Sequence, residues 1–249
     1  MYRQICILVK PDVPAAPSDY FPPMTAALDT RPQSESRQPR PRRARAERPQ
    51  DLYEHILATA SRLFYTRGVR AVGVDLVILE AGIAKTSLYR YFPTKDDLIV
   101  AFLQREDEDF WAVWNAVTEQ HADDPVAEVE GHMRWIGERL ARSNYRGCPQ
   151  INVAAEFAEP DHPARRVAKA HMLALRERLT DIAHRMGVPR PSELAAQLSV
   201  LVNGAFVSSS LLAPEEAVEV LVASARALCA AALIDSKTQG KPQHSRRRA

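Results

Sequence analysis

The chain has 249 residues and a formal net charge of +2; 46% of its residues are apolar and 26% are charged. This length allows one large domain or two smaller ones, and the apolar fraction is enough to form a hydrophobic core. The three cysteines are far apart and show no CxxC or Cys/His ligand spacing, which argues against a disulfide framework and a structural zinc site.

The first segment, residues 1–48, is rich in Pro and Arg, and six arginines fall between Arg37 and Arg48. Its prolines follow no helical or strand period, which predicts a disordered arm. The arm either adds phosphate contacts beside a DNA-reading helix or is a solvated tail. The run Ile5–Val9 is too short for a signal-peptide core and no other run approaches a membrane span, so we expect a soluble cytoplasmic protein without a membrane partner.

A first helix is predicted over residues 51–67, where apolar residues recur at helical spacing. Asp51 is placed to cap this helix, with Glu54 three residues later as in a capping box. Arg67 followed by Gly68 marks its end.

Residues 73–98 predict two short helices joined by a tight turn, followed by a third helix. Gly82 suits the left-handed backbone just past the end of the first of them. In the second, Leu88 and Phe92 are four residues apart and are expected to point inward. The outward side chains are rich in hydrogen-bond donors, contain no carboxylate and suit the major groove of DNA. They are Lys85, Thr86, Ser87, Tyr89, Arg90 and Tyr91.

Thr94, with Asp97 three residues on, is predicted to cap a long helix that runs to about Gln120. Lys95 lies in its first turn, where free amide groups favour a phosphate. Further helical patterns follow around 125–140, 151–157, 160–186, 192–212 and 214–234, and no strand pattern occurs. We therefore predict an all-α protein that ends in a basic tail over 236–249.

Residues 50–105 resemble the TetR family of bacterial transcriptional regulators. The resemblance rests on several short runs at the right mutual spacing: Leu63-Phe64, Arg67-Gly68, Val74-Asp75, Ala81-Gly82-Ile83, Ser87-Leu88-Tyr89, Phe92 and Lys95-Asp96-Asp97-Leu98. It implies a three-helix DNA-binding domain over 49–109, with its helix-turn-helix at 73–92, joined to a helical regulatory and dimerisation domain over 110–235. It also implies a homodimer that binds a near-palindromic DNA operator and is released, as a repressor, by a small-molecule effector, without a cofactor or metal.

The family's DNA contacts carry over to named positions here. The resemblance places base and phosphate contacts at Lys85, Thr86, Ser87, Arg90 and Tyr91, and phosphate contacts at Tyr89 and Lys95. Ala84 stands where a serine often caps the recognition helix, so the resemblance predicts an uncapped start. Ile78 and Leu79 are bulkier than usual, which changes the packing of the supporting helix or leaves Leu79 exposed.

Candidate effector contacts in the C-terminal domain are aromatic or polar residues within apolar stripes. They are Phe110, Trp114, Trp135, Cys148, Phe157, His171 and Phe206. Each aromatic residue is equally consistent with core packing. Trp135 lies opposite the apolar stripe of its helix and either packs on another helix or lines a cavity. His171 is a hydrogen-bonded core histidine or a ligand contact, Cys148 an inert thiol or a pocket thiol and redox sensor, and Glu106 a buried acid or part of a solvated acidic run.

Three classes of function remain at this stage. The small residues of the last two helices allow a close dimer interface, although the same residues can pack inside one subunit. The alternatives to a ligand-switched regulator are a helical DNA-binding protein without a switch and a helical-bundle enzyme. The enzyme alternative lacks sequence support, because the chain has no HExxH motif, no Gly-rich phosphate loop and no GxSxG turn.

Overall fold

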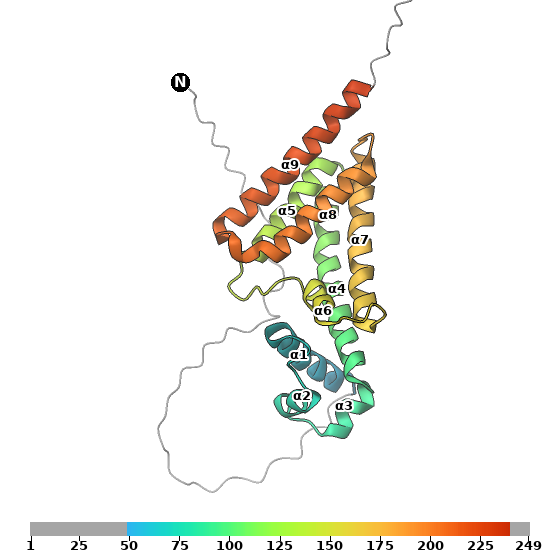
Figure 1. The fold of residues 1–249 in the computed structure, drawn as a ribbon, viewed down its shortest axis with the longest axis vertical. Coiled ribbons are helices and arrows are strands. Elements are labelled where there is room, and N and C mark those ends of the chain that lie inside the picture. Colours follow the sequence, from blue (N-terminus) through green and yellow to red (C-terminus); the bar gives the residue numbers. More distant parts are fainter. Residues whose placement is uncertain (1–48, 240–249) are drawn as a thin grey trace, which may run out of the picture. The chain divides into compact units, whose positions relative to one another are not determined.

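The computed structural model describes residues 49–239, in which every regular element is helical (Figure 1). The all-α prediction is therefore confirmed for this range. The predicted arm at 1–48 and residues 240–249 of the predicted tail lie outside it, whereas residues 236–239 belong to the last helix. The elements are α1 Pro49–Arg67, α2 Val74–Ala81, α3 Lys85–Tyr91, α4 Lys95–Gln120, α5 Pro125–Leu140, α6 Pro149–Glu156, α7 Pro163–Arg185, α8 Pro191–Ser208, the short 3₁₀ helix η2 Ser209–Leu211, and α9 Pro214–Gln239.

The start of α1 differs from the prediction. The helix begins at Pro49, so Asp51 lies within the first turn instead of capping it. Proline is well suited to the first turn, because its fixed φ is helical and its missing N–H needs no partner there. Glu54 does not return to the helix start either; its carboxylate accepts hydrogen bonds from Gln50 and from Arg105 of α4.

The turn between α2 and α3 forms as its sequence predicts. Gly82 has φ +64°, a backbone conformation that residues with a Cβ rarely adopt. Ala84 makes no side-chain cap at the start of α3, as predicted. Thr94 and Asp97 form a reciprocal capping box, with Asp97 N–H donating to Thr94 Oγ1 at 3.1 Å and Thr94 N–H donating to Asp97 Oδ2 at 2.9 Å. These local signals fix where α2 ends and where α4 begins.

Two hydrophobic cores meet along α4. The first joins α1, α2, α3 and the start of α4 down to Leu103, and it also includes Val153 of α6 and Ala164 of α7. The second begins at Phe110 and continues through α5, α7, α8 and α9. Because Val153 of α6 and Ala164 of α7 belong to the first core, the hydrophobic core of the N-terminal helices is incomplete without these two helices.

The C-terminal helices pack in pairs, with α5 along α9 and α7 along α8 (Figure 1). Gly137 makes the α5–α9 approach possible, since a Cβ there would lie 2.6 Å from the Cα of Val218. Large apolar side chains remain exposed on the other side of the last helices. They are Val200 and Val207 of α8, Leu211 of η2, and Val220 and Ile234 of α9.

The expectation that no further run approaches a membrane span needs a correction. Within the described residues, Pro214–Ile234 of α9 is long and apolar enough for one, with a mean hydropathy of 1.9. One such helix is weak evidence for a membrane, because packed helices of soluble proteins pass the same test. Here α9 packs along α5 and α8. Its many Ala, Val and Leu residues both raise its hydropathy and allow this packing.

Candidate DNA-binding and ligand sites

The exposed side of α3 carries four of the predicted contact residues. Leu88, fully buried, anchors the helix, while Lys85, Thr86, Tyr89 and Arg90 are exposed. Phe92 is buried just after the helix ends. A seven-residue helix held from one side in this way presents its polar side chains on a firm support.

Two neighbouring interactions orient the charged groups of this surface. The Arg90 guanidinium lies 5.0 Å from the centre of the Tyr91 ring. Lys85 Nζ lies 3.2 Å from Asp75 Oδ1, and this bond raises the pKa of Lys85. Both partners of the ion pair are exposed, so it is weak and can exchange for a phosphate contact. The prediction considered only the residues of α3, and it missed the carboxylate that α2 supplies.

Ser87, Tyr91 and Lys95 are half-buried. The Tyr91 ring meets the Tyr53 ring of α1 edge to face, with centroids 6.0 Å apart, so part of it packs against the domain. Lys95 lies in the first turn of α4, and burial lowers the pKa of its ammonium group. The roles of all seven side chains in DNA binding stay predictions.

A sequence profile described as "Bacterial regulatory proteins, tetR family" matches residues 56–102. The match starts within α1 and ends within α4, so it includes the whole α2–α3 unit. Over these residues the chain is similar to the TetR family. The predicted resemblance is therefore confirmed.

Known transcriptional regulators are similar to part of the chain. The regulator YxaF of Bacillus subtilis is 30% identical over 47% of this chain and 62% of its own length. The regulator EthR of Mycolicibacterium smegmatis is 37% identical over 51% of this chain and 59% of its own length. The chain thus matches less than two thirds of these relatives. The crystal structure of the TetR-family regulator SCO4454 from Streptomyces coelicolor is 28% identical, with a TM-score of 0.71 over 74% of this chain and 91% of that one.

Four of the seven predicted effector contacts lie around one small cavity. Residues of α4, α5, α6, α7 and α8 and the residue just before α6 line it, and we call it the α6 pocket. Its lining residues are Glu106, Phe110, Arg139, Cys148, Pro149, Gln150, His171 and Phe206. Phe110, Cys148, His171 and Phe206 were predicted, whereas Arg139, Pro149 and Gln150 were not, and Glu106 was only one of two alternatives.

The other three predicted contacts lie elsewhere. Trp135 packs behind the pocket against Phe110, with ring centroids 4.9 Å apart, which is the helix-packing alternative. Trp114 stacks on the buried ring of His132 at 3.6 Å. Phe157 packs against the first hydrophobic core. Its ring stacks on His162 at 3.7 Å, with the Arg70 guanidinium 5.6 Å from its centre.

The polar groups of the α6 pocket are buried or half-buried, and burial shifts the pKa of three of them. It raises the pKa of Glu106 against the opposing effect of Arg139, whose Nη2 lies 3.7 Å from Glu106 Oε2. It also raises the pKa of the Cys148 thiol, which favours the unreactive protonated form. Burial lowers the pKa of His171, although Asp107 opposes this by bonding to Nδ1. His171 is thus both hydrogen-bonded and part of the pocket wall.

Helix α6 links this pocket to the DNA-binding helices. Its N-terminal end supplies Pro149 and Gln150 to the pocket wall. At its C-terminal end, the Glu156 carboxylate accepts hydrogen bonds from the backbone N–H groups of Val69, at 3.1 Å, and Arg70, at 2.7 Å. Both amides belong to the loop between α1 and α2. The sequence gives no signal for this contact, because its partners are 86 and 87 residues apart.

A second contact joins the residues before α6 to α1. The backbone N–H of Arg146 donates to Tyr65 Oη at 2.8 Å, and Tyr65 Oη–H donates to the Gly147 carbonyl at 3.3 Å. The Arg146 guanidinium also donates to the Tyr65 carbonyl at 3.0 Å. The segment 146–156 is therefore bonded to the DNA-binding helices on both sides of α6.

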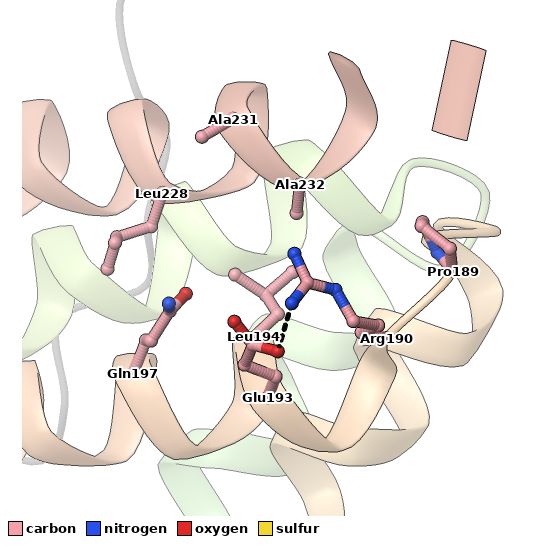
Figure 2. A pocket seen from close by; sticks show the side chains of 8 residues that line it. All are labelled: Pro189, Arg190, Glu193, Leu194, Gln197, Leu228, Ala231 and Ala232. Carbon is pink, nitrogen blue, oxygen red and sulfur yellow. Dashed lines mark hydrogen bonds and ion pairs between the residues drawn. The ribbon is translucent and has the colours of Figure 1, made fainter. Parts of the chain in front are cut away.

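Another groove lies between the start of α8 and the second half of α9 (Figure 2). Its volume is about 140 Å³, and the Arg190 side chain extends between the two helices, with Nη1 2.7 Å from Glu193 Oε2. None of the predicted effector contacts lines it. Within residues 49–239, no group of three or more His, Cys, Asp or Glu side chains is placed to hold a metal ion.

Proposed function

We propose that the protein is a DNA-binding transcriptional regulator that acts in the cytoplasm as a homodimeric repressor and leaves a near-palindromic operator when a small molecule binds. The observation that carries the proposal is the surface of α3, where Lys85, Thr86 and Arg90 are exposed above the buried Leu88. A short donor-rich helix fits the major groove, where an arginine can bond to a guanine edge in two places. This function needs no catalytic residue and no cofactor.

The dimer is formed by α8 and α9. Val200 and Val207 are seven residues apart and 73% and 68% exposed in the single chain, so they share one face of α8. Leu211 of η2 and Val220 and Ile234 of α9 are exposed apolar side chains as well. Exposed apolar side chains gathered on neighbouring helices favour a protein partner. A second copy of the chain supplies the second recognition helix that a near-palindromic operator requires.

The switch passes through α6. An effector in the α6 pocket displaces Pro149 and Gln150 at one end of this eight-residue helix. Glu156, at its other end, holds the amides of Val69 and Arg70. A short rigid helix bonded at both ends transmits a shift without needing a longer chain of contacts. An effector that binds more tightly to the shifted arrangement lowers the population that fits DNA.

Footprinting of the DNA upstream of the chain's own gene and of its neighbours tests the proposal. We expect one protected, near-palindromic segment whose affinity falls steeply with salt, as phosphate contacts require. Absence of any protected segment would count against regulation of these genes. Protection that no pocket-binding compound reverses would instead favour a DNA-binding protein without a ligand switch.

A further inference from the structure

Two buried polar atoms in the α6 pocket lack a hydrogen-bond partner. They are Gln150 Oε1 and His171 Nε2, and neither is paired with any group in the described part of the chain. Both residues are almost fully buried, at 2% and 3% exposure, and both line the pocket. Buried polar groups in native proteins nearly always have partners. Two unpaired atoms in one pocket therefore point to a ligand that bonds to them.

Both unpaired atoms are hydrogen-bond acceptors. The Gln150 amide nitrogen donates to the Leu103 carbonyl at 2.9 Å, which fixes the other end of the amide as the oxygen. His171 Nδ1 lies 2.5 Å from Asp107 Oδ1, and a carboxylate only accepts, so Nδ1 carries the hydrogen. Because burial lowers the pKa of His171, the ring is neutral and Nε2 presents a lone pair. A ligand that satisfies these atoms must donate.

The charges in the pocket are already balanced. Glu106 and Arg139 face each other at 3.7 Å, one negative and one positive. A charged ligand would bring a further charge without a free counter-ion, and burying an unpaired charge is costly. A carboxylate group, in addition, has no hydrogen to offer to Gln150 or His171. The rest of the wall is apolar, with the rings of Phe110 and Phe206 and with Pro149.

We infer that the effector is an uncharged molecule whose hydroxyl or amide hydrogens donate to Gln150 Oε1, to His171 Nε2 or, where it has two, to both, and whose apolar or aromatic body lies against Phe110 and Phe206. This inference deepens the proposed ligand switch and rests on it. The pocket has a volume of about 10 Å³ in this arrangement, which is room for roughly one water molecule. A larger ligand must therefore push the wall outward, and Gln150 belongs to α6.

Four small probes of similar size test the ligand class: phenol, toluene, benzoate and benzylammonium. Phenol is uncharged and donates one hydrogen bond, toluene is uncharged without a donor, and the other two are charged. Binding to the full-length chain is measured by isothermal titration calorimetry at pH 7. We expect phenol to bind at least about tenfold more tightly than each of the others, because a site built to bond a hydroxyl rejects analogues that lack it. Equal binding of toluene or tighter binding of benzoate overturns the inference, as does binding of none of the four.

Two variants test which atoms accept the hydrogen bond. Gln150→Leu and His171→Phe each remove one acceptor while keeping an apolar group of similar size. Because phenol bonds to one acceptor at a time, the variant that removes its acceptor is expected to reduce the preference for phenol over toluene at least about threefold, and the double variant is expected to remove the preference. His184→Phe, an exposed position on the same helix as His171, is the matched control and keeps the full preference. Each variant is compared at a temperature well below its own melting transition, and an unchanged preference in a folded variant contradicts its role.

DNA release is measured separately, on the footprinted fragment, so that two failures can be told apart. Phenol that binds through Gln150 or His171 without releasing DNA supports the ligand class and contradicts the proposed switch. If benzoate or benzylammonium binds the chain more tightly than phenol and releases DNA, the result supports the switch and contradicts the ligand class.

Discussion

Arg90 and Lys95 carry similar charge but lie in different surroundings, so their loss has different effects. Arg90 is exposed on α3 beside the Tyr91 ring, whereas Lys95 is half-buried in the first turn of α4. We expect Arg90→Ala to weaken operator binding by about 1–3 kcal/mol and non-specific binding much less. Lys95→Ala should weaken both alike and reduce the salt dependence. Titrations of operator and scrambled DNA at several salt concentrations measure this, and equal losses in both variants would remove the base-contact role of Arg90.

His132 makes stability depend on pH. It is fully buried against Trp114, and burial lowers its pKa despite the opposing Glu128; His121 and Arg178 lower it further. A histidine whose folded pKa is lowered stabilises the protein above its unfolded pKa of about 6.5, and this contribution is lost as the pH falls below that value. Thermal melting between pH 8 and 5 should therefore show a steeper decline for the native chain than for His132→Phe. Parallel curves would contradict this origin of the pH dependence.

At the scale of elements, α6 is the part whose role depends most on contacts distant in sequence. We expect Glu156→Gln to weaken the two bonds to the Val69 and Arg70 amides, since hydrogen bonds to a charged acceptor contribute about 1.5–3 kcal/mol. Hydrogen exchange at these two amides should become faster, and DNA affinity should change with it. Glu159→Gln, an exposed carboxylate three residues later, is the matched control. Unchanged exchange in the Glu156 variant would exclude this carboxylate as the link.

Local signals predicted the elements better than they predicted the contacts between them. Gly82, Thr94 and Asp97 act within a few residues of themselves, so the turn and the cap were predictable. Glu54 was assigned to a local cap, but its carboxylate accepts a hydrogen bond from Arg105, 51 residues away.

The same limit explains the errors at the pocket. Arg139 and Gln150 are polar residues outside the apolar stripes, so the sequence did not identify them as pocket residues. Only the packing of α4, α5 and α6 brings them close to Glu106 and His171. Phe157 was assigned to the pocket on aromatic character alone. Helix α6 ends at Glu156, and Phe157 then packs against the first core. Side-chain type identified half of the pocket wall, and tertiary contacts determine the rest.

At the scale of the molecule, the proposed dimer would tie DNA binding to the surface of α8 and α9. If a second copy covers Val200 and Val207, a buried carboxylate at either position separates the subunits. Val200→Glu and Val207→Glu should each yield monomers in sedimentation experiments and lose operator affinity by at least about tenfold, or 1.4 kcal/mol. Leu173→Glu, also an exposed apolar position but on α7, serves as the control and should stay dimeric. Because each monomer keeps its own α3, non-specific DNA binding by the variants should persist; operator binding that survives in a monomer would separate recognition from dimer formation.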